Sequence, residues 1–142
     1  MRYRFLSLED YDKVVELWKR SGLKFKPAGR DSERAISEQM IKQPNMFLGA
    51  FDAERLVCIA MLTDDGRKGW INRLAVDPEY QRKGVAAEII KRAEETFRSR
   101  GIFLFAALVE DWNIPSQNLF KKLGYKKHDD IYYFSKRDFD DY

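Results

Sequence analysis

The fold of this chain is decided by residues 70–101, WINRLAVDPEYQRKGVAAEIIKRAEETFRSRG. Residues 70–76 carry the apolar pattern of a buried strand, which ends at Asp77-Pro78 because proline offers no N–H to a sheet. Past Gly84, apolar residues recur at helical spacing until Gly101, where a left-handed C-cap is expected. The stretch therefore predicts a strand, a polar loop and a helix.

The junction between that strand and that helix, Gln81-Arg-Lys-Gly-Val-Ala86, has the features of an anion site. The first N–H groups of a helix lack intrahelical acceptors, and the helix dipole favours negative charge there. Gly84 and Ala86 let phosphate oxygens approach the backbone, and Arg82 and Lys83 add two cations. The spacing is neither that of a P-loop nor that of a dinucleotide fingerprint. Taken alone, the junction also fits a plain loop with two solvated basic residues.

A second motif lies further along the chain, at Asn113-Ile-Pro-Ser-Gln-Asn-Leu-Phe-Lys-Lys-Leu-Gly-Tyr125. Together the two segments resemble the GCN5-related N-acetyltransferase (GNAT) family. The stretch from Leu74 to Ala86 is similar to that family's acyl-CoA-binding motif, Gln/Arg-x-x-Gly-x-Gly/Ala after a strand that ends in Val-x-Pro. The second motif is similar to the family's later Asn-x-x-Ser/Ala…Leu-Tyr-x-x-Leu-Gly-Phe segment, and the two occur in the family's order.

This resemblance implies an acetyl-CoA-dependent N-acetyltransferase, in which a primary amine attacks the thioester directly in a ternary complex. The pantetheine arm would lie between two splayed strands and pair with the backbone of Leu74, Ala75 and Val76. The pyrophosphate would rest on backbone N–H groups at the helix start, those of Arg82, Lys83, Gly84, Val85, Ala86 and Ala87. Asn113 would lie along the cofactor arm, a role compatible with that of a helix N-cap.

The catalytic groups are less well marked. Many family members place a tyrosine four residues before the glycine of Leu-Gly-Phe to protonate the departing thiolate, and here Phe120 holds that position. Other members carry a glutamate base on a splayed strand, where this chain has Trp70 and Leu108. We therefore expect Glu110 or Asp111 to accept the proton, directly or through water. Carboxylates just past a strand are equally typical of solvated or capping side chains.

Two further groups of side chains are candidates for contacts at the reaction centre. Tyr132 and Tyr133 are alternatives to the missing acid, and they also fit a role as core or rim aromatics. In the resembled family the first two helices and the loop between them cover the acceptor. Phe25, Lys26 and Arg30 are therefore candidate acceptor contacts, although a mobile loop with solvated cations fits them as well. A basic loop would favour an acceptor with a carboxylate or phosphate over a polyamine.

The composition excludes several other classes of protein. The 142 residues predict a single domain over residues 1–142, and 44% hydrophobic residues argue against disorder. The net charge of +3 reflects 26 cations against 23 anions, so it is no signature of a nucleic-acid partner. No apolar run has transmembrane length, and no signal-peptide segment is evident. These features predict a cytoplasmic protein that binds neither membrane nor nucleic acid.

The single cysteine and the single histidine indicate no further catalytic or metal site. Cys58 is the only cysteine and His128 the only histidine, so no intramolecular disulfide, no cysteine metal site and no catalytic triad is expected. Cys58 lies within a strand pattern, where a buried and inert thiol is the usual state. These counts predict no metal, and the resemblance to the GNAT family implies acetyl-CoA as cosubstrate.

The remaining segments complete a predicted element order of βααβββαβαββ, an α/β fold with a mixed sheet and helices on both faces. The expected strands cover residues 2–6, 46–51, 55–63, 70–76 and 102–109, followed by a terminal hairpin of residues 125–127 and 131–135. Two helices follow the first strand, one follows the central strand, and the last begins at Asn113. No internal repeat or linker is evident.

Three functions fit the sequence. An active N-acetyltransferase is the first, acting on a small-molecule or protein amine. The absence of the family's tyrosine and glutamate also fits a catalytically weak or inactive CoA-binding regulatory module. The third is an interaction domain without a cofactor, against which the intact Gln81–Ala86 junction argues. Homodimers are common in the resembled family, and the sequence leaves that state open.

Overall fold

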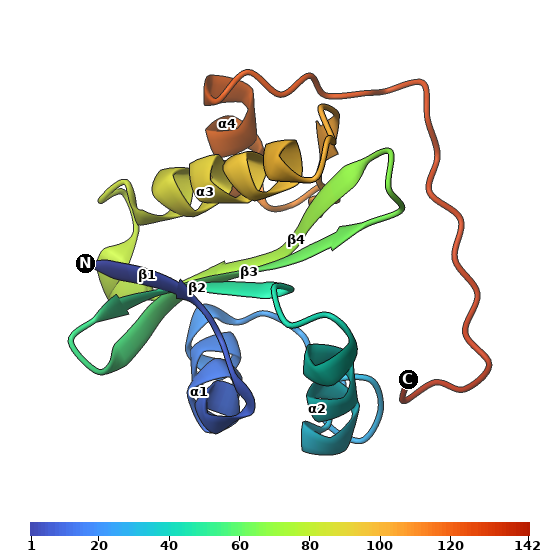
Figure 1. The fold of residues 1–142 in the computed structure, drawn as a ribbon. Coiled ribbons are helices and arrows are strands. Elements are labelled where there is room, and N and C mark those ends of the chain that lie inside the picture. Colours follow the sequence, from blue (N-terminus) through green and yellow to red (C-terminus); the bar gives the residue numbers. More distant parts are fainter.

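A computed structural model describes residues 1–142 as a five-stranded mixed sheet between two layers of helices (Figure 1). The strands lie in chain order across the sheet: β1 (Arg2–Phe5), β2 (Phe47–Asp52), β3 (Arg55–Asp64), β4 (Gly69–Val76) and β5 (Phe105–Ala106). All neighbours pair antiparallel except β4 and β5, which are parallel. The predicted fold class, a mixed sheet with helices on both faces, is confirmed.

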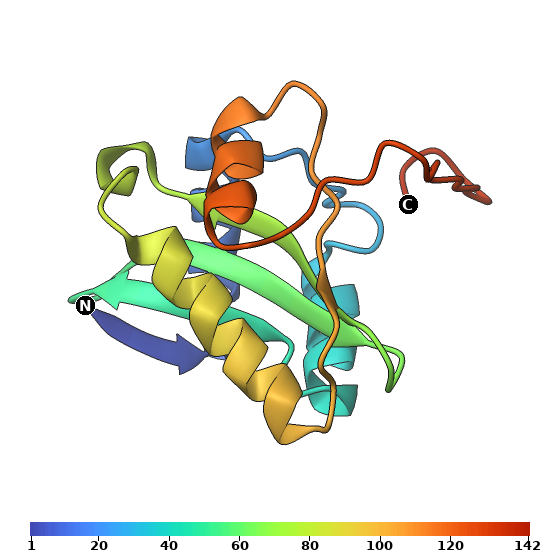
Figure 2. The same ribbon diagram turned by 90° about the horizontal axis from the view of Figure 1, so that it is seen from above.

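Two pairs of helices cover the sheet (Figures 1 and 2). One face carries α1 (Tyr11–Ser21) and α2 (Glu33–Lys42), and the other carries α3 (Val85–Ser99) and α4 (Ile114–Lys122). Two short 3-10 helices, η1 (Leu8–Asp10) and η2 (Pro78–Tyr80), precede α1 and the loop before α3. None of the helices combines the length and apolar character that a membrane span requires.

Each face of the sheet has its own hydrophobic core. The amphipathic spacing along α3 places Ile89, Ile90 and Phe97 against the sheet with no exposed surface. On the opposite face, Leu17 and Trp18 of α1 are buried to the same extent. Burial of a large apolar side chain stabilises the fold by about 1.5–3 kcal/mol. The two cores therefore fix the sheet between the helical layers and position the loops at its edges.

Two predicted strand regions differ in the structure. The strand expected over residues 102–109 pairs only at β5, and the terminal hairpin of residues 125–127 and 131–135 does not form. Residues 131–134 are instead 67–90% exposed, in a segment that runs away from the sheet (Figure 2). The strand propensity of such segments reflects how well they fit a neighbouring strand. No strand pairs with residues 125–135, so their local pattern is not realised.

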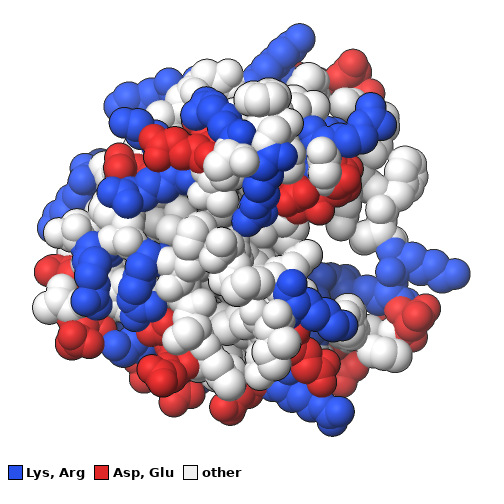
Figure 3. All heavy atoms as spheres, viewed as in Figure 1, with Lys and Arg blue, Asp and Glu red and all other residues white.

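Charged side chains of both signs are interspersed over the face shown in Figure 3. This distribution agrees with the near balance of 26 cations and 23 anions in the sequence. No large field of one sign dominates this face, so the charges that bear on function are local ones.

Candidate functional site

The strands β4 and β5 separate after a very short ladder. Only Gly69 with Phe105 and Trp70 with Ala106 are paired. At the next step the Leu108 N–H donates at 3.0 Å to the side-chain oxygen of Asn72, not to the backbone of β4. Beyond that point, Ala75 and Val76 keep their neighbours in β3, and residues 74–76 have no paired strand on the β5 side. The split therefore exposes backbone donors and acceptors along one edge of β4.

The loop before α3 leaves the start of that helix open. Gly84 is the N-cap residue, with φ +79°, and no side chain caps the helix. By contrast, Ser32 accepts the Ala35 N–H at the start of α2, and Asn113 accepts the Ser116 N–H at the start of α4. The first N–H groups of α3 therefore remain available to an outside acceptor, at the positive end of the helix dipole.

Space is present beside this helix start. A side chain at Gly84 would meet no atom within 4 Å. A hollow of about 260 Å³ runs from it along α3. Its lining consists of Gly84, Ala87, Glu88, Ile90, Lys91 and Glu94 of the α3 region and Leu123 after α4. Arg82, which also has a left-handed backbone at φ +62°, precedes this turn and is exposed. Left-handed residues in such loops are typical of the concave backbone nests that bind anions.

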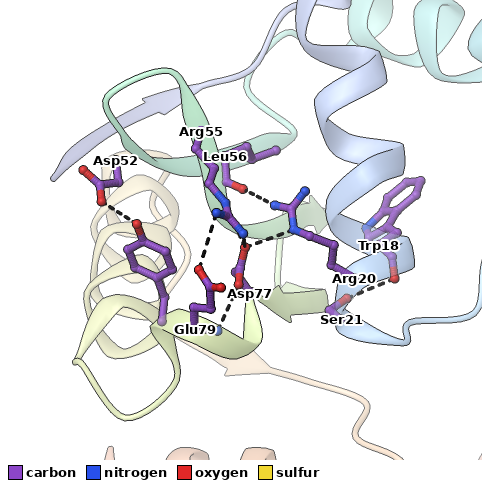
Figure 4. A network of polar contacts seen from close by, with 9 residues as sticks. Trp18, Arg20, Ser21, Asp52, Arg55, Leu56, Asp77 and Glu79 are labelled. Atoms are coloured by element: carbon purple, nitrogen blue, oxygen red, sulfur yellow. Dashed lines mark hydrogen bonds and ion pairs between the residues drawn. The ribbon is translucent and has the colours of Figure 1, made fainter.

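A buried carboxylate anchors the turn between β4 and this loop (Figure 4). Asp77 is 1% exposed, and its Oδ2 accepts from Arg20 Nε at 3.0 Å and from Arg55 Nη2 at 2.8 Å. Its Oδ1 accepts the Glu79 N–H at 2.9 Å, and Arg20 also donates to the Leu56 carbonyl at 2.9 Å. The network thereby joins α1, the start of β3 and the η2 turn.

The protonation of Asp77 follows from these contacts. Burial by itself raises the pKa of this carboxyl group, but the Glu79 N–H and the Arg55 guanidinium outweigh burial. The pKa of Asp77 is consequently lowered from its ordinary value, and the group is ionised at neutral pH. A charged and fully bonded Asp77 thereby anchors the η2 turn, which leads into the loop before α3.

A second charged cluster lies under the loop between α1 and α2. β4 bulges opposite Ala60, because Ile59 pairs with Ala75 and Met61 with Asn72, and the extra residue Arg73 has φ +53°. The Arg73 guanidinium lies 4.6 Å from the ring centre of Trp18 and donates at 3.0 Å to Asp31. Burial lowers the pKa of Arg73, and the nearby charge of Arg30 acts in the same direction, while Asp31 opposes both.

The predicted acceptor contacts border this cluster. Phe25 is half-buried and packs on Trp18 with ring centres 5.6 Å apart. The Lys26 N–H donates at 2.7 Å to Asp31, and the Lys26 side chain reaches the Asp140 carbonyl at 3.0 Å. Arg30 is exposed on the same loop. Phe25 and Lys26 thus also help to shape the loop, and their contact with an acceptor stays a prediction.

The structure also locates the predicted catalytic candidates. Glu110 and Asp111 are exposed in the turn before α4, and their backbone carbonyls accept from the Gln117 side chain. Phe120 is 6% exposed and meets Tyr125 edge-on at 5.0 Å. The Tyr125 hydroxyl is occupied, because it donates at 2.6 Å to Glu94 of α3. Neither carboxylate at the turn makes a contact that would fix it as a base.

The two tyrosines suggested as substitute acids are far less constrained. Tyr132 is 81% exposed and Tyr133 is 71% exposed, in the segment where the predicted hairpin is absent. With the hairpin missing, no element holds either hydroxyl near the split between β4 and β5. Asn113 caps α4 as predicted, with its side-chain oxygen 3.2 Å from the Ser116 nitrogen, and its role toward a cofactor stays a prediction.

The split sheet and the open helix start lie within a region that matches a known protein family. The Acetyltransferase (GNAT) family matches residues 11–125. The chain belongs to this family. Two relatives named as acetyltransferases, SG1711 of Sodalis glossinidius and plu1384 of Photorhabdus laumondii, are 30% and 31% identical to it. Each alignment covers 96% of this chain and 95% of the relative.

Solved GNAT structures share the fold. The PaiA N-acetyltransferase of Thermoplasma acidophilum, crystallised in complex with coenzyme A, superposes with a TM-score of 0.80 at 24% identity. The match covers 90% of this chain and 91% of that one. The resemblance inferred from the two sequence motifs is therefore confirmed at the level of the family and of the fold.

Several residues of this GNAT site were not singled out as site residues from the sequence. Local sequence patterns mark Asp77 as the end of a strand and Asp31 as the start of a helix, whereas the structure shows that both are buried carboxylates that bind arginines. Arg73 lies within the strand predicted over residues 70–76, and its bulge was not predicted. The signal that could have found it is the pair Asn72-Arg73, which interrupts an apolar strand and so indicates a bulge.

Proposed function

We propose that this GNAT protein transfers an acetyl group from acetyl-CoA to a primary amine. One observation carries the proposal: the uncapped start of α3 and the split between β4 and β5 are joined by a single turn, which the buried Asp77 anchors. A ligand with phosphates at one end and a polar, chain-like arm at the other suits this arrangement. The phosphates meet backbone N–H groups, and the arm completes the unpaired edge of β4.

The cofactor residues follow from this arrangement. The pyrophosphate is assigned to the backbone at residues 82–87, with the hollow beside Gly84 and Ala87 as the space next to it. The pantetheine arm is assigned to the backbone of residues 74–76, along the edge that lacks a strand partner. Asn113 keeps its amide N–H groups free while its oxygen caps α4, and we assign them to the same arm.

The proposed reaction is direct transfer in a ternary complex. The lone pair of a neutral amine attacks the thioester carbon, the C–N bond forms, the C–S bond breaks, and the thiolate of CoA leaves. The amine loses one proton to water or to Glu110 or Asp111, which are exposed beside the split, and the thiolate gains one. The amine and the thioester are held side by side in the ternary complex, and this positioning supplies the main part of the rate acceleration.

An acyl-cysteine route is poorly supported. Cys58 is the only cysteine, it is fully buried in β3, and burial raises the pKa of its thiol to about 12. A thiol in that state is neither accessible nor ionised at neutral pH.

The experiment that tests the cofactor site is calorimetric titration with acetyl-CoA. Ala86→Asp places an anion at the helix start, where the pyrophosphate is assigned, and should abolish binding. Ser99→Asp adds the same charge at the far end of α3 and serves as the matched control. Binding by wild type and Ser99→Asp, and its loss in Ala86→Asp, is the expected result. Equal binding by all three proteins would place the phosphates elsewhere.

A regulatory CoA-binding module is the second candidate. The observation that favours it is the lack of a fixed acid or base: Phe120 stands in the tyrosine position, and Glu110 and Asp111 are exposed without ordering contacts. Thiol release from acetyl-CoA, measured across a panel of amines, separates the two functions. Tight binding of acetyl-CoA without release by any amine would identify the regulatory module.

A further inference from the structure

The bulge of β4 places a strained, charged residue at the end of the split. A left-handed backbone is rare outside glycine and persists where the surrounding structure enforces it, often at functional sites. Arg73 adopts it at φ +53°, and its side chain is only 15% exposed. The bulge turns this side chain toward α1 and the loop of residues 23–32, where it meets Trp18 and Asp31.

The cluster around Arg73 has too few hydrogen-bond acceptors for its buried donors. Two buried side-chain nitrogens of the protein have no partner, Arg73 Nε and Trp18 Nε1, and they belong to adjacent groups. Buried donors without partners are costly and rare in native proteins. Because both are donors, what would complete the cluster is an oxygen from another molecule.

The one carboxylate bonded to Arg73 is already engaged. Asp31 accepts from Arg73 and from the Lys26 N–H. The acidic end of the chain lies beside Lys26 and Gly29, where the Lys26 ammonium bonds to the Asp140 carbonyl and the Asp141 carbonyl faces Gly29. Arg30, exposed on the same loop, forms no ion pair, and its charge lowers the pKa of Arg73. Arg30 is therefore a cation without an anionic partner, next to a guanidinium that has only one.

The position of the cluster suits the acceptor and not the cofactor. A cofactor arm that follows β4 away from the start of α3 passes residues 76 to 74 and then reaches Arg73 and Asn72. The opposite face of β4 is closed there, since Ile71 is 1% exposed and Gly69 packs on the ring of Phe97. An acceptor must approach the thioester from the face on which Arg73 lies.

We propose that Arg73 and Arg30 bind an oxyanion of the amine acceptor, a carboxylate or a phosphate group. This assignment rests on the proposed transfer to an amine and adds its substrate class. Asp31 holds one edge of the Arg73 guanidinium and leaves the remaining N–H groups to the ligand. Arginine suits this role because its planar donors match the oxygens of both anions.

The experiment compares matched acceptors. We would measure kcat/KM for thiol release with β-alanine against β-alaninamide and with phosphoethanolamine against ethanolamine. The anionic member should be preferred about tenfold or more in at least one pair, since charge-assisted arginine bonds are worth at least that factor. The pair that shows the preference identifies the anion. Equal or better use of the neutral members would overturn the proposal.

Variants test which residues are responsible for the preference for the anionic acceptor. Arg30→Gln should reduce it several-fold, and Lys24→Gln, an equal change at an exposed position of the same loop, should not. The double variant Arg73→Gln/Asp31→Asn removes both members of the buried pair, so that neither charge is left alone. It should raise KM for the anionic acceptor more than KM for the neutral one. A preference that survives in this variant would contradict the assignment.

A second measurement is independent of turnover. With CoA at saturation and constant ionic strength, inorganic phosphate or acetate should raise the Tm of the wild type and of Lys24→Gln. The rise should be absent in Arg73→Gln/Asp31→Asn. If no amine is acetylated, the proposed transfer fails, and this shift still decides the anion site. No shift in the wild type, or an equal shift in the double variant, would refute the site.

Discussion

Asp77→Asn tests whether one carboxylate anchors the turn that carries the helix start. Asparagine keeps the shape of the side chain and an acceptor for the Glu79 N–H, but it removes the charge that Arg20 and Arg55 share. The Asp77 side chain is 1% exposed, whereas Arg20 is 32% and Arg55 45% exposed. In the variant the two arginines can therefore turn toward water. The loss of stability arises mainly at the buried side chain of residue 77.

The magnitude follows from the bonds that are lost. A hydrogen bond to a charged group contributes about 1.5–3 kcal/mol, and breaking a fully buried pair costs about 3–5 kcal/mol. Because both arginines are partly solvated, we expect Asp77→Asn to lower the free energy of unfolding by about 2 kcal/mol, near the lower bound. For a chain of this length, that change lowers the Tm by about 5–10 °C.

The pH dependence has a defined sign. The pKa of Asp77 is lowered in the folded protein, so its contribution is present above the unfolded pKa of about 4 and is lost as the pH falls through the folded value. Urea unfolding of wild type and Asp77→Asn, followed by tryptophan fluorescence, should therefore differ at pH 7 and converge toward pH 3. The same variant should weaken acetyl-CoA binding several-fold, because the turn before α3 loses its anchor.

The control is Asp12→Asn, an exposed carboxylate on α1, which should change the free energy of unfolding by less than about 0.5 kcal/mol. An effect of Asp77→Asn as small as that of the control would refute the anchoring argument. A loss of 2 kcal/mol that persists unchanged at pH 3 would show that packing, and not charge, is responsible.

Three further changes test other parts of the structure. Gly69→Ala would place a methyl group 2.5 Å from the Phe97 ring, and we expect urea unfolding to show a loss of about 1–3 kcal/mol from overpacking. Cys58→Ala should retain full thiol release, because the buried thiol takes no part in direct transfer; loss of turnover without loss of fold would favour an acyl-cysteine. Glu110→Gln and Asp111→Asn together should lower kcat at least several-fold at neutral pH if either carboxylate accepts the proton, and an unchanged pH profile would remove both from the mechanism.

Much of the fold could be read from local patterns. The segment of residues 70–101 forms the predicted strand, loop and helix, as β4, η2 and α3, because periodicity and the turn residues specify them within a few positions. The strands β2 and β3 also lie within one residue of the predicted ranges. The terminal hairpin failed for a physical reason: residues 131–135 have strand propensity, but no neighbouring strand pairs with them.

The candidate site likewise has features that the local sequence predicts and features that only tertiary packing decides. The sequence by itself determined the family motifs, the glycine at the start of α3 and the asparagine that caps α4, since each depends on residues close together in the chain. The tertiary structure alone decided that Arg20, Arg55 and Asp77 form one network, and that Arg73 meets Asp31 beneath the α1–α2 loop. These pairs are separated by 22 to 57 positions along the chain. Their contact depends on how the sheet and helices pack, which no local pattern encodes.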